Sequence, residues 1–165
     1  MSEVWLSGPI DGVPPLLMPP AHTLVQVRHD VTSLLGELPS EQLWRPVGAS
    51  APIGFHALHI AGSIERLMTY ARGEQLTDAQ MHALGGEPTM TGLAAHDLTA
   101  RVDGAIDVAL QQIRATPADA LLIERFVGRK MLPSTTLGLI VHAAEHALRH
   151  AGQMATLKKV LDAQT

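Results

Sequence analysis

Residues 139–154 read LIVHAAEHALRHAGQM, and in them His142, His146 and His150 follow one another at intervals of four residues. Four residues of α-helix advance about 40° past a full turn, so these histidines lie almost above one another on one face. Most residues around them are small or apolar, namely Ala143, Ala144, Ala147, Leu148 and Ala151, which predicts a largely buried helix. Neighbouring imidazoles on such a face, with Cβ atoms roughly 5–6 Å apart, are close enough to share one ion.

A buried imidazole needs a partner for each of its two nitrogens, and each missing partner costs about 1–3 kcal/mol. One divalent metal ion satisfies two histidines at once, whereas the alternative is a set of core histidines that bond to carbonyls and waters. For an i, i+4 pair on an apolar helix, we favour the metal. A third ligand must then come from another helix, and His59 has the most suitable surroundings. Three imidazoles without a carboxylate are typical of catalytic zinc sites, which keep one position open for water or substrate.

Four segments with apolar residues at i, i+3, i+4 spacing, joined by polar connectors, predict an all-α four-helix bundle. The first and second helices are expected at residues 21–38 and 50–73, and the third and fourth at residues 91–115 and 135–161. Ser134 is expected to cap the fourth helix. The proline-rich residues 1–20 predict an extended N-terminal arm, and residues 21–165 form the bundle domain.

The connectors and the glycines give further expectations. Trp44 is expected to anchor the connector before the second helix, and residues 74–91 to contain a short helical turn near 77–84 and to cover a site, as long loops often do. Residues 121–133 are expected to be partly extended. Three basic residues in this segment are expected to be exposed to solvent rather than to bind an anion: Arg125, Arg129 and Lys130. Four glycines inside helices predict close packing or the approach of a ligand: Gly54, Gly62, Gly138 and Gly152.

The amino-acid composition and the absence of some motifs argue against several classes of function. The 165 residues suit one domain, and the formal charge of −4 argues against a nucleic-acid partner. The chain has no cysteine, so it lacks thiolate ligands and a thiol nucleophile of its own. It has no basic start typical of a signal peptide and no apolar run long enough to cross a membrane, so we expect a soluble cytoplasmic protein. The sequence contains neither the HExxH of zincins nor the repeated ExxH of di-iron bundles.

Two motifs carry a family resemblance. Residues 52–73 read PxGFHxxHIxGSIxRLxxYxxG, and residues 129–153 read RKxLPSTTLGLxVHxAEHxxRHxGQ. Together they resemble the DinB-like (damage-inducible) superfamily, over residues 21–161. The resemblance implies a four-helix bundle, often dimeric, with a divalent metal held by three histidines. The first ligand falls on His59 and the closing HxxxHxGQ pair on His146 and His150. His142 would then sit beside the ligands, although His142 with His146 is the alternative pair.

The resemblance also sets the functional hypotheses. We expect one divalent ion per subunit, Zn²⁺ or Ni²⁺. Family members with known activity are thiol-dependent transferases and isomerases that use bacillithiol, mycothiol or glutathione, so a thiol S-transferase or isomerase with a low-molecular-weight thiol is the first hypothesis. A metal-dependent hydrolase and a non-enzymatic metal-binding or stress-response module are the alternatives. Three charged residues lie near the expected ligands, and none is convincing as a general base from sequence alone: Glu65, Glu145 and Arg149.

The fourth helix is apolar around most of its circumference and therefore needs cover on most sides. Either the N-terminal arm or a second subunit can supply that cover. We favour a homodimer with C₂ symmetry, because such dimers are the commonest oligomers and the resembling family often forms them. Each metal site is expected to lie within one subunit.

Overall fold

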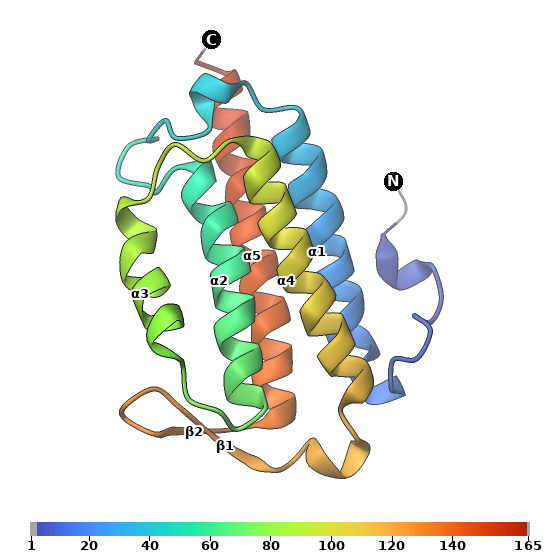
Figure 1. The fold of residues 1–165 in the computed structure, drawn as a ribbon. Helices are drawn as coiled ribbons and strands as arrows, with labels where there is room; N and C mark the ends of the chain where they lie inside the picture. Colours follow the sequence, from blue (N-terminus) through green and yellow to red (C-terminus); the bar gives the residue numbers. More distant parts are fainter. Residues whose placement is uncertain (1–2, 165) are drawn as a thin grey trace.

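Four long helices form the bundle in the computed structural model, which describes residues 3–164 (Figure 1). They are α1 (Met18–Gly36), α2 (Ile53–Ala71), α4 (Ala95–Ala115) and α5 (Thr136–Asp162). Helix α5 packs against α1 and α2, and α4 packs against the other faces of the same two helices. The predicted all-α four-helix bundle is therefore confirmed. The expected arm and bundle domain also include residues 1, 2 and 165, which lie outside the described residues.

Helix α1 begins three residues earlier than the sequence predicted. It starts at Met18, with Pro19 and Pro20 in its first turn. The first four N–H groups of a helix have no intrahelical partner, so a proline there loses no hydrogen bond. The arm before it consists of two short 3₁₀ turns, Val4–Leu6 and Pro15–Leu17, and it packs on α1. Its buried residues Val4 and Val13 attach it to the bundle.

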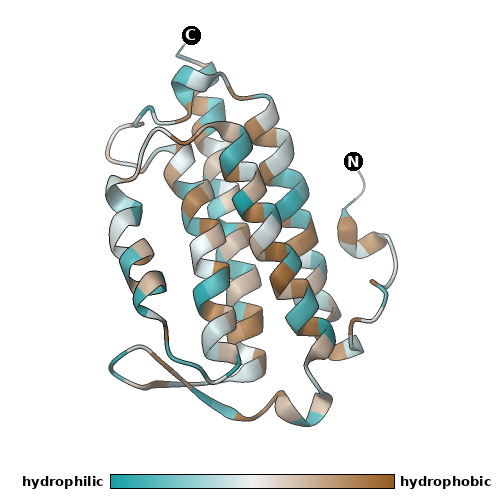
Figure 2. Cartoon of the chain, viewed as in Figure 1, coloured by the Kyte–Doolittle hydropathy of each residue, from teal (hydrophilic) through white to brown (hydrophobic). Residues whose placement is uncertain are grey.

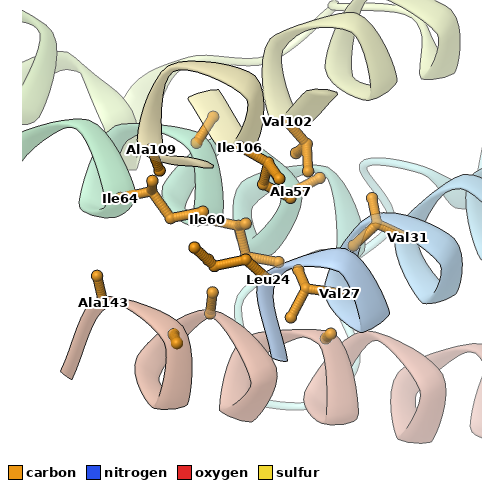
Figure 3. Close-up of a cluster of buried hydrophobic side chains, with 14 of the residues drawn as sticks. Leu24, Val27, Val31, Ala57, Ile60, Ile64, Val102, Ile106, Ala109 and Ala143 are labelled. Atoms are coloured by element: carbon orange, nitrogen blue, oxygen red, sulfur yellow. The ribbon is translucent and has the colours of Figure 1, made fainter. Parts of the chain in front are cut away.

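The core is built from one face of each long helix. Each helix carries both hydrophobic and hydrophilic residues around its circumference (Figure 2). The hydrophobic ones meet in the middle of the bundle (Figure 3), where they include Leu24, Val27, Val31, Ala57, Ile60, Ile64, Val102, Ile106, Ala109 and Ala143. The core-facing residues of α5 around its histidines are mostly alanines, among them Ala143 and Ala147. These short side chains let α2 come close to α5, so side chains of the two helices can meet.

A β-hairpin connects α4 to α5, in the segment expected to be partly extended. Its strands β1 (Glu124–Val127) and β2 (Leu132–Thr135) pair antiparallel, with Glu124 opposite Thr135. Thr135 caps α5 by accepting a hydrogen bond from Gly138 N at 3.0 Å, so the expected cap at Ser134 is wrong by one residue. Arg125 donates to the carbonyl of Ala71 at 2.9 Å and so closes the end of α2, which leaves it a structural role.

Side chains, rather than a helix or ligand, approach the glycines of α2. Trp44 donates from Nε1 to the carbonyl of Leu93 at 2.9 Å, which confirms it as an anchor. A Cβ on Gly54 would lie 2.8 Å from the Trp44 ring, so this glycine makes room for the indole. In α5, a Cβ on Gly138 would lie 3.0 Å from the hydroxyl of Ser134, whereas nothing lies within 4 Å of one on Gly152. Close side-chain contacts therefore account for Gly138, whereas Gly152 has open space beside it and lines a cavity, so the approach of a ligand stays a prediction there.

A fifth helix, α3 (Asp78–Gly86), lies beside α2 outside the bundle (Figure 1), where the short helical turn was predicted. Thr77 and Gln80 form a capping box at its start, and none of its own residues is buried. A 3₁₀ turn, Glu87–Thr89, follows it directly. Within residues 3–164, no helix combines the length and the hydrophobicity needed to cross a membrane.

Candidate metal centre

Helices α2 and α5 bring three histidines together. One ring nitrogen of each of His59, His146 and His150 lies within 4.8 Å of the corresponding nitrogen of the other two. The Nε2 atoms of His59 and His146 are 3.1 Å apart, and the ring centroid of His150 lies 4.7 Å from both other rings. Over residues 3–164, this is the one group of three histidine or carboxylate side chains with the spacing of metal ligands.

The geometry of the three imidazoles fits a tetrahedral ion. With zinc–nitrogen bonds of about 2.0–2.1 Å, two nitrogens of one tetrahedron lie about 3.3 Å apart. The observed 3.1 Å between His59 and His146 is close to that value, and a ring nitrogen of His150 lies within 4.8 Å of both. Without a metal, one of these two Nε2 atoms carries the proton of an N–H···N hydrogen bond, and a divalent ion can take the place of that proton. The donor set therefore suits a divalent ion.

The other nitrogen of each ring has its own surroundings. His59 Nδ1 donates to Glu87 Oε2 at 2.6 Å, and His150 Nδ1 faces His56 Nδ1 at 2.8 Å, where one of the two carries the shared proton. His146 Nδ1 is buried and has no hydrogen-bond partner among the described residues. With Nδ1 engaged in His59 and His150, each of these two rings keeps Nε2 for a metal.

Lowered pKa values favour the neutral, metal-binding form of His146 and His150 and the neutral form of His56. Burial, followed by the charges of nearby histidines, lowers the pKa of His150 to about 4. Burial and the charge of His59 also lower the pKa of His146 and of His56. Burial alone would raise the pKa of Glu87, but hydrogen bonds from His59 and Arg66 outweigh it and lower the pKa overall. At neutral pH the rings of His56, His146 and His150 are therefore neutral.

The sequence reasoning missed Glu87 and did not assign His56. Glu87 is only 4% exposed and forms a buried ion pair with Arg66. It lies in the long connector that was expected to cover a site, but its contact with His59 spans 28 positions and follows no periodic pattern. His56, which is also buried, lies three residues before His59 in the motif of residues 52–73, and no role was assigned to it from the sequence. Within the connector, the signal for Glu87 was a charged residue followed by proline in a glycine-containing loop.

His142 lies outside the group of three. Its Nδ1 bonds to Glu145 Oε1 at 2.7 Å, and Glu145 also accepts a hydrogen bond from Arg149 at 2.8 Å. All three side chains are about half exposed. Hydrogen bonds from His142 and Arg149 lower the pKa of Glu145. Glu65 is exposed on another face of α2, where it accepts from Gln80 at 3.1 Å. The structure thus puts Glu145 and Arg149 at the rim of the site and Glu65 away from it.

Two cavities adjoin the centre. One, of about 440 Å³, is lined by His56, Arg149, Gly152 and Gln153, among others, and so reaches the partner of His150. The other, of about 510 Å³, lies between α2, α3 and α4 and has mostly apolar walls, with Glu87 in its lining. The first offers a small molecule a polar approach beside the histidines.

Comparison with known proteins agrees with this architecture. A family model described as the DinB superfamily matches residues 23–154. A crystal structure of a candidate DinB-family member from Exiguobacterium sibiricum superposes with a TM-score of 0.70 at 15% identity, over 94% of this chain and 95% of that one. A DinB-like protein from Bacillus cereus superposes with a TM-score of 0.61 at 16% identity, over 82% of this chain and 86% of that one. No protein of curated function matches the chain.

Proposed function

The chain belongs to the DinB superfamily, and from this premise we propose that it is a metal protein in which His59, His146 and His150 hold one divalent ion per subunit. The observation that carries the proposal is the meeting of their three ring nitrogens within 4.8 Å. The lowered pKa values of His146 and His150 support it, because a ligand imidazole must be neutral. Imidazoles suit several metals, and Zn²⁺ and Ni²⁺ are the proposed ions.

Three protein ligands leave a tetrahedral ion one open position, which is the arrangement of catalytic rather than structural zinc sites. A metal bound there would lower the pKa of a coordinating thiol or water and so supply a nucleophile at neutral pH. The chain has no cysteine, so a thiol nucleophile must come from a cosubstrate. We infer that the protein is a thiol S-transferase or isomerase that uses a low-molecular-weight thiol, as the resemblance to thiol-dependent relatives implies.

The residues around the 440 Å³ cavity give this cosubstrate a place to bind. Arg149 lies at its wall and carries a positive charge, which suits the carboxylates of glutathione and similar thiols. Arg149 is held in place by Glu145, and His56 at the inner end contacts His150. Burial lowers the pKa of His56, so its ring is neutral at neutral pH and has a lone pair for a proton, although it is a weaker base than a free histidine. The chain itself therefore contributes an anchor for the cosubstrate and a base near the ligands.

An activity screen tests the reaction class. We expect the zinc- or nickel-loaded protein to transfer glutathione, mycothiol or bacillithiol to electrophiles, with turnover that disappears on chelation. The Arg149→Gln variant should raise the KM for the thiol more than it lowers kcat, because it removes a carboxylate partner. Turnover of esters or amides without added thiol would instead support the metal-dependent hydrolase. Tight metal binding with no turnover of any substrate would favour the non-enzymatic metal-binding or stress-response module.

We further propose that two chains form a homodimer through the outer face of α5. Val141 and Leu148 are 43% and 42% exposed on this helix, whereas the N-terminal arm packs on α1. The arm is therefore an unsuitable cover for that face. A stable dimer should bury more than about 1,000 Å² in total.

Light scattering at micromolar concentration is expected to give twice the mass of one chain. The Leu148→Glu variant should give a single chain's mass, because it would place a charge inside the interface. Val108→Glu is the matched control on α4, where the side chain is 58% exposed. A wild-type mass of one chain would refute the dimer.

A further inference from the structure

The carboxylate of Glu87 is built into the bundle, although Glu87 belongs to the connector between α2 and α4. One oxygen, Oε2, accepts from His59 Nδ1 at 2.6 Å, and the other, Oε1, accepts from Arg66. Both Glu87 and Arg66 are buried, at 4% and 8% exposure. Between residues 72 and 97 of the structure, Glu87 is the one buried residue, so it is the most deeply placed of the connector's attachments to the bundle, which also include the hydrogen bonds of Gln80 and Leu93.

Helix α2 provides a fitted recess for this carboxylate. His59, Gly62 and Arg66 follow at i, i+3 and i+7, so they share one face of the helix. A Cβ on Gly62 would collide with Glu87 Oε1 and would lie only 2.6 Å from Arg66 Nη1. A glycine inside a helix costs about 1 kcal/mol relative to alanine. The space that this glycine leaves is filled by the Glu87–Arg66 ion pair.

Each nitrogen of the His59 ring faces a partner of its own. Nδ1 points at Glu87, and Nε2 of the same ring points at His146 Nε2, 3.1 Å away. An ion pair that only fastened the connector to α2 would be complete with Arg66 and would not require His59. Histidines that bind metals commonly donate the N–H of their other ring nitrogen to a carboxylate. This hydrogen bond fixes the tautomer and makes the metal-binding nitrogen more basic.

We propose that Glu87 is a positioning residue for the metal. It accepts the Nδ1 proton of His59, holds the ring with the Nε2 lone pair toward His146 and His150, and is itself held by Arg66. The inference rests on the proposed metal site. Glu87 also couples metal binding to the connector of residues 74–94, which it helps to attach to the bundle. Because linked equilibria act in both directions, metal binding should in turn hold this connector on the bundle.

Zinc affinity, measured by competition with a chromophoric chelator, tests the proposal without reference to activity. Glu87→Gln should weaken zinc binding by about 10–100-fold, the usual effect of losing such a partner. Since Glu87→Gln leaves Arg66 without its charge partner and could unfold the chain, the double variant Arg66→Met/Glu87→Met replaces the ion pair by apolar side chains. It should fold and show the same loss of affinity. Ile106→Val is the matched control, because it loosens the core away from the histidines and should leave zinc affinity unchanged.

Hydrogen exchange gives a second measurement that a merely structural ion pair would not change. Zinc should slow amide exchange in residues 74–94 of the wild type and leave it unchanged in Arg66→Met/Glu87→Met. Wild-type zinc affinity in a folded double variant, or equal protection of this connector by zinc in both proteins, would overturn the role of Glu87. A wild type that binds no zinc would instead refute the metal site itself, so the two failures are distinguishable.

Discussion

Replacing His146 by alanine is expected to abolish stoichiometric metal binding. His146 contributes the nitrogen that faces His59 at 3.1 Å, and its removal leaves two ligands on different helices. The loss of one of three protein ligands should weaken metal binding by about 10²–10⁴-fold, or roughly 3–5 kcal/mol. Metal content after dialysis against a weak chelator, measured by mass spectrometry, checks this result.

His142→Ala is the matched control for this experiment. It removes a histidine one turn away on the same helix, whose Nδ1 bonds to Glu145 instead of facing the other rings. We expect this variant to keep one ion per chain. Equal metal content in His146→Ala and wild type would contradict the site, and loss of metal in His142→Ala would restore the alternative pair of His142 with His146.

Metal loading is expected to stabilise the folded protein by about 4 kcal/mol when free metal exceeds the dissociation constant about 1,000-fold. The reason is that the ion binds the folded chain, where α2 and α5 bring the ligands together, far better than the unfolded one. Denaturant unfolding with zinc and with chelator, for the wild type and for His146→Ala, measures the difference. An equal free energy of unfolding in zinc and in chelator would contradict the prediction, and His146→Ala should show that equality.

The free energy of unfolding measured in this way should depend on pH. Unfolded histidines have a pKa of about 6.5, whereas in the folded, metal-free chain the pKa of His150 is lowered to about 4. Between these two values the unfolded chain binds more protons, so the stability of the metal-free protein should fall as the pH falls from about 6.5 to 4 and be fully present above 6.5. The stabilisation by metal should also shrink toward acid pH, because protons compete for the ligand nitrogens. Constant stability over this range would argue against buried neutral histidines.

The bundle could be predicted because its helices depend on local periodicity. The apolar stripes that include Leu24, Ile60 and Ile106 follow the i, i+3, i+4 pattern, and all three residues are buried in the core. Details at helix ends were harder to predict, because neighbouring residues satisfied the same rule. Ser134 and Thr135 both carry a hydroxyl that can cap a helix, and only the backbone geometry selects Thr135.

The candidate site was predictable only where its residues share a helix. The spacing of His146 and His150 places both on one face of α5, whereas His59 was chosen for its surroundings and assigned by the family resemblance. The position of His142 depends on how α5 is rotated against α2, which a four-residue repeat leaves open. Glu87 could not be found in this way, because its contact with His59 depends on how a non-helical connector folds back onto α2. Gly62 gave an indirect indication of that contact, because a glycine inside a helix predicts that another group comes close to it.

Anomalous diffraction from crystals of the zinc-loaded protein, recorded at the zinc edge, tests the metal site most directly. The account predicts one strong peak per chain, about 2.0–2.1 Å from a ring nitrogen of each of His59, His146 and His150. It also predicts no contact from His142 and a fourth position occupied by a non-protein ligand. A peak held by other residues, or no peak between α2 and α5 in crystals soaked with excess zinc, would contradict it.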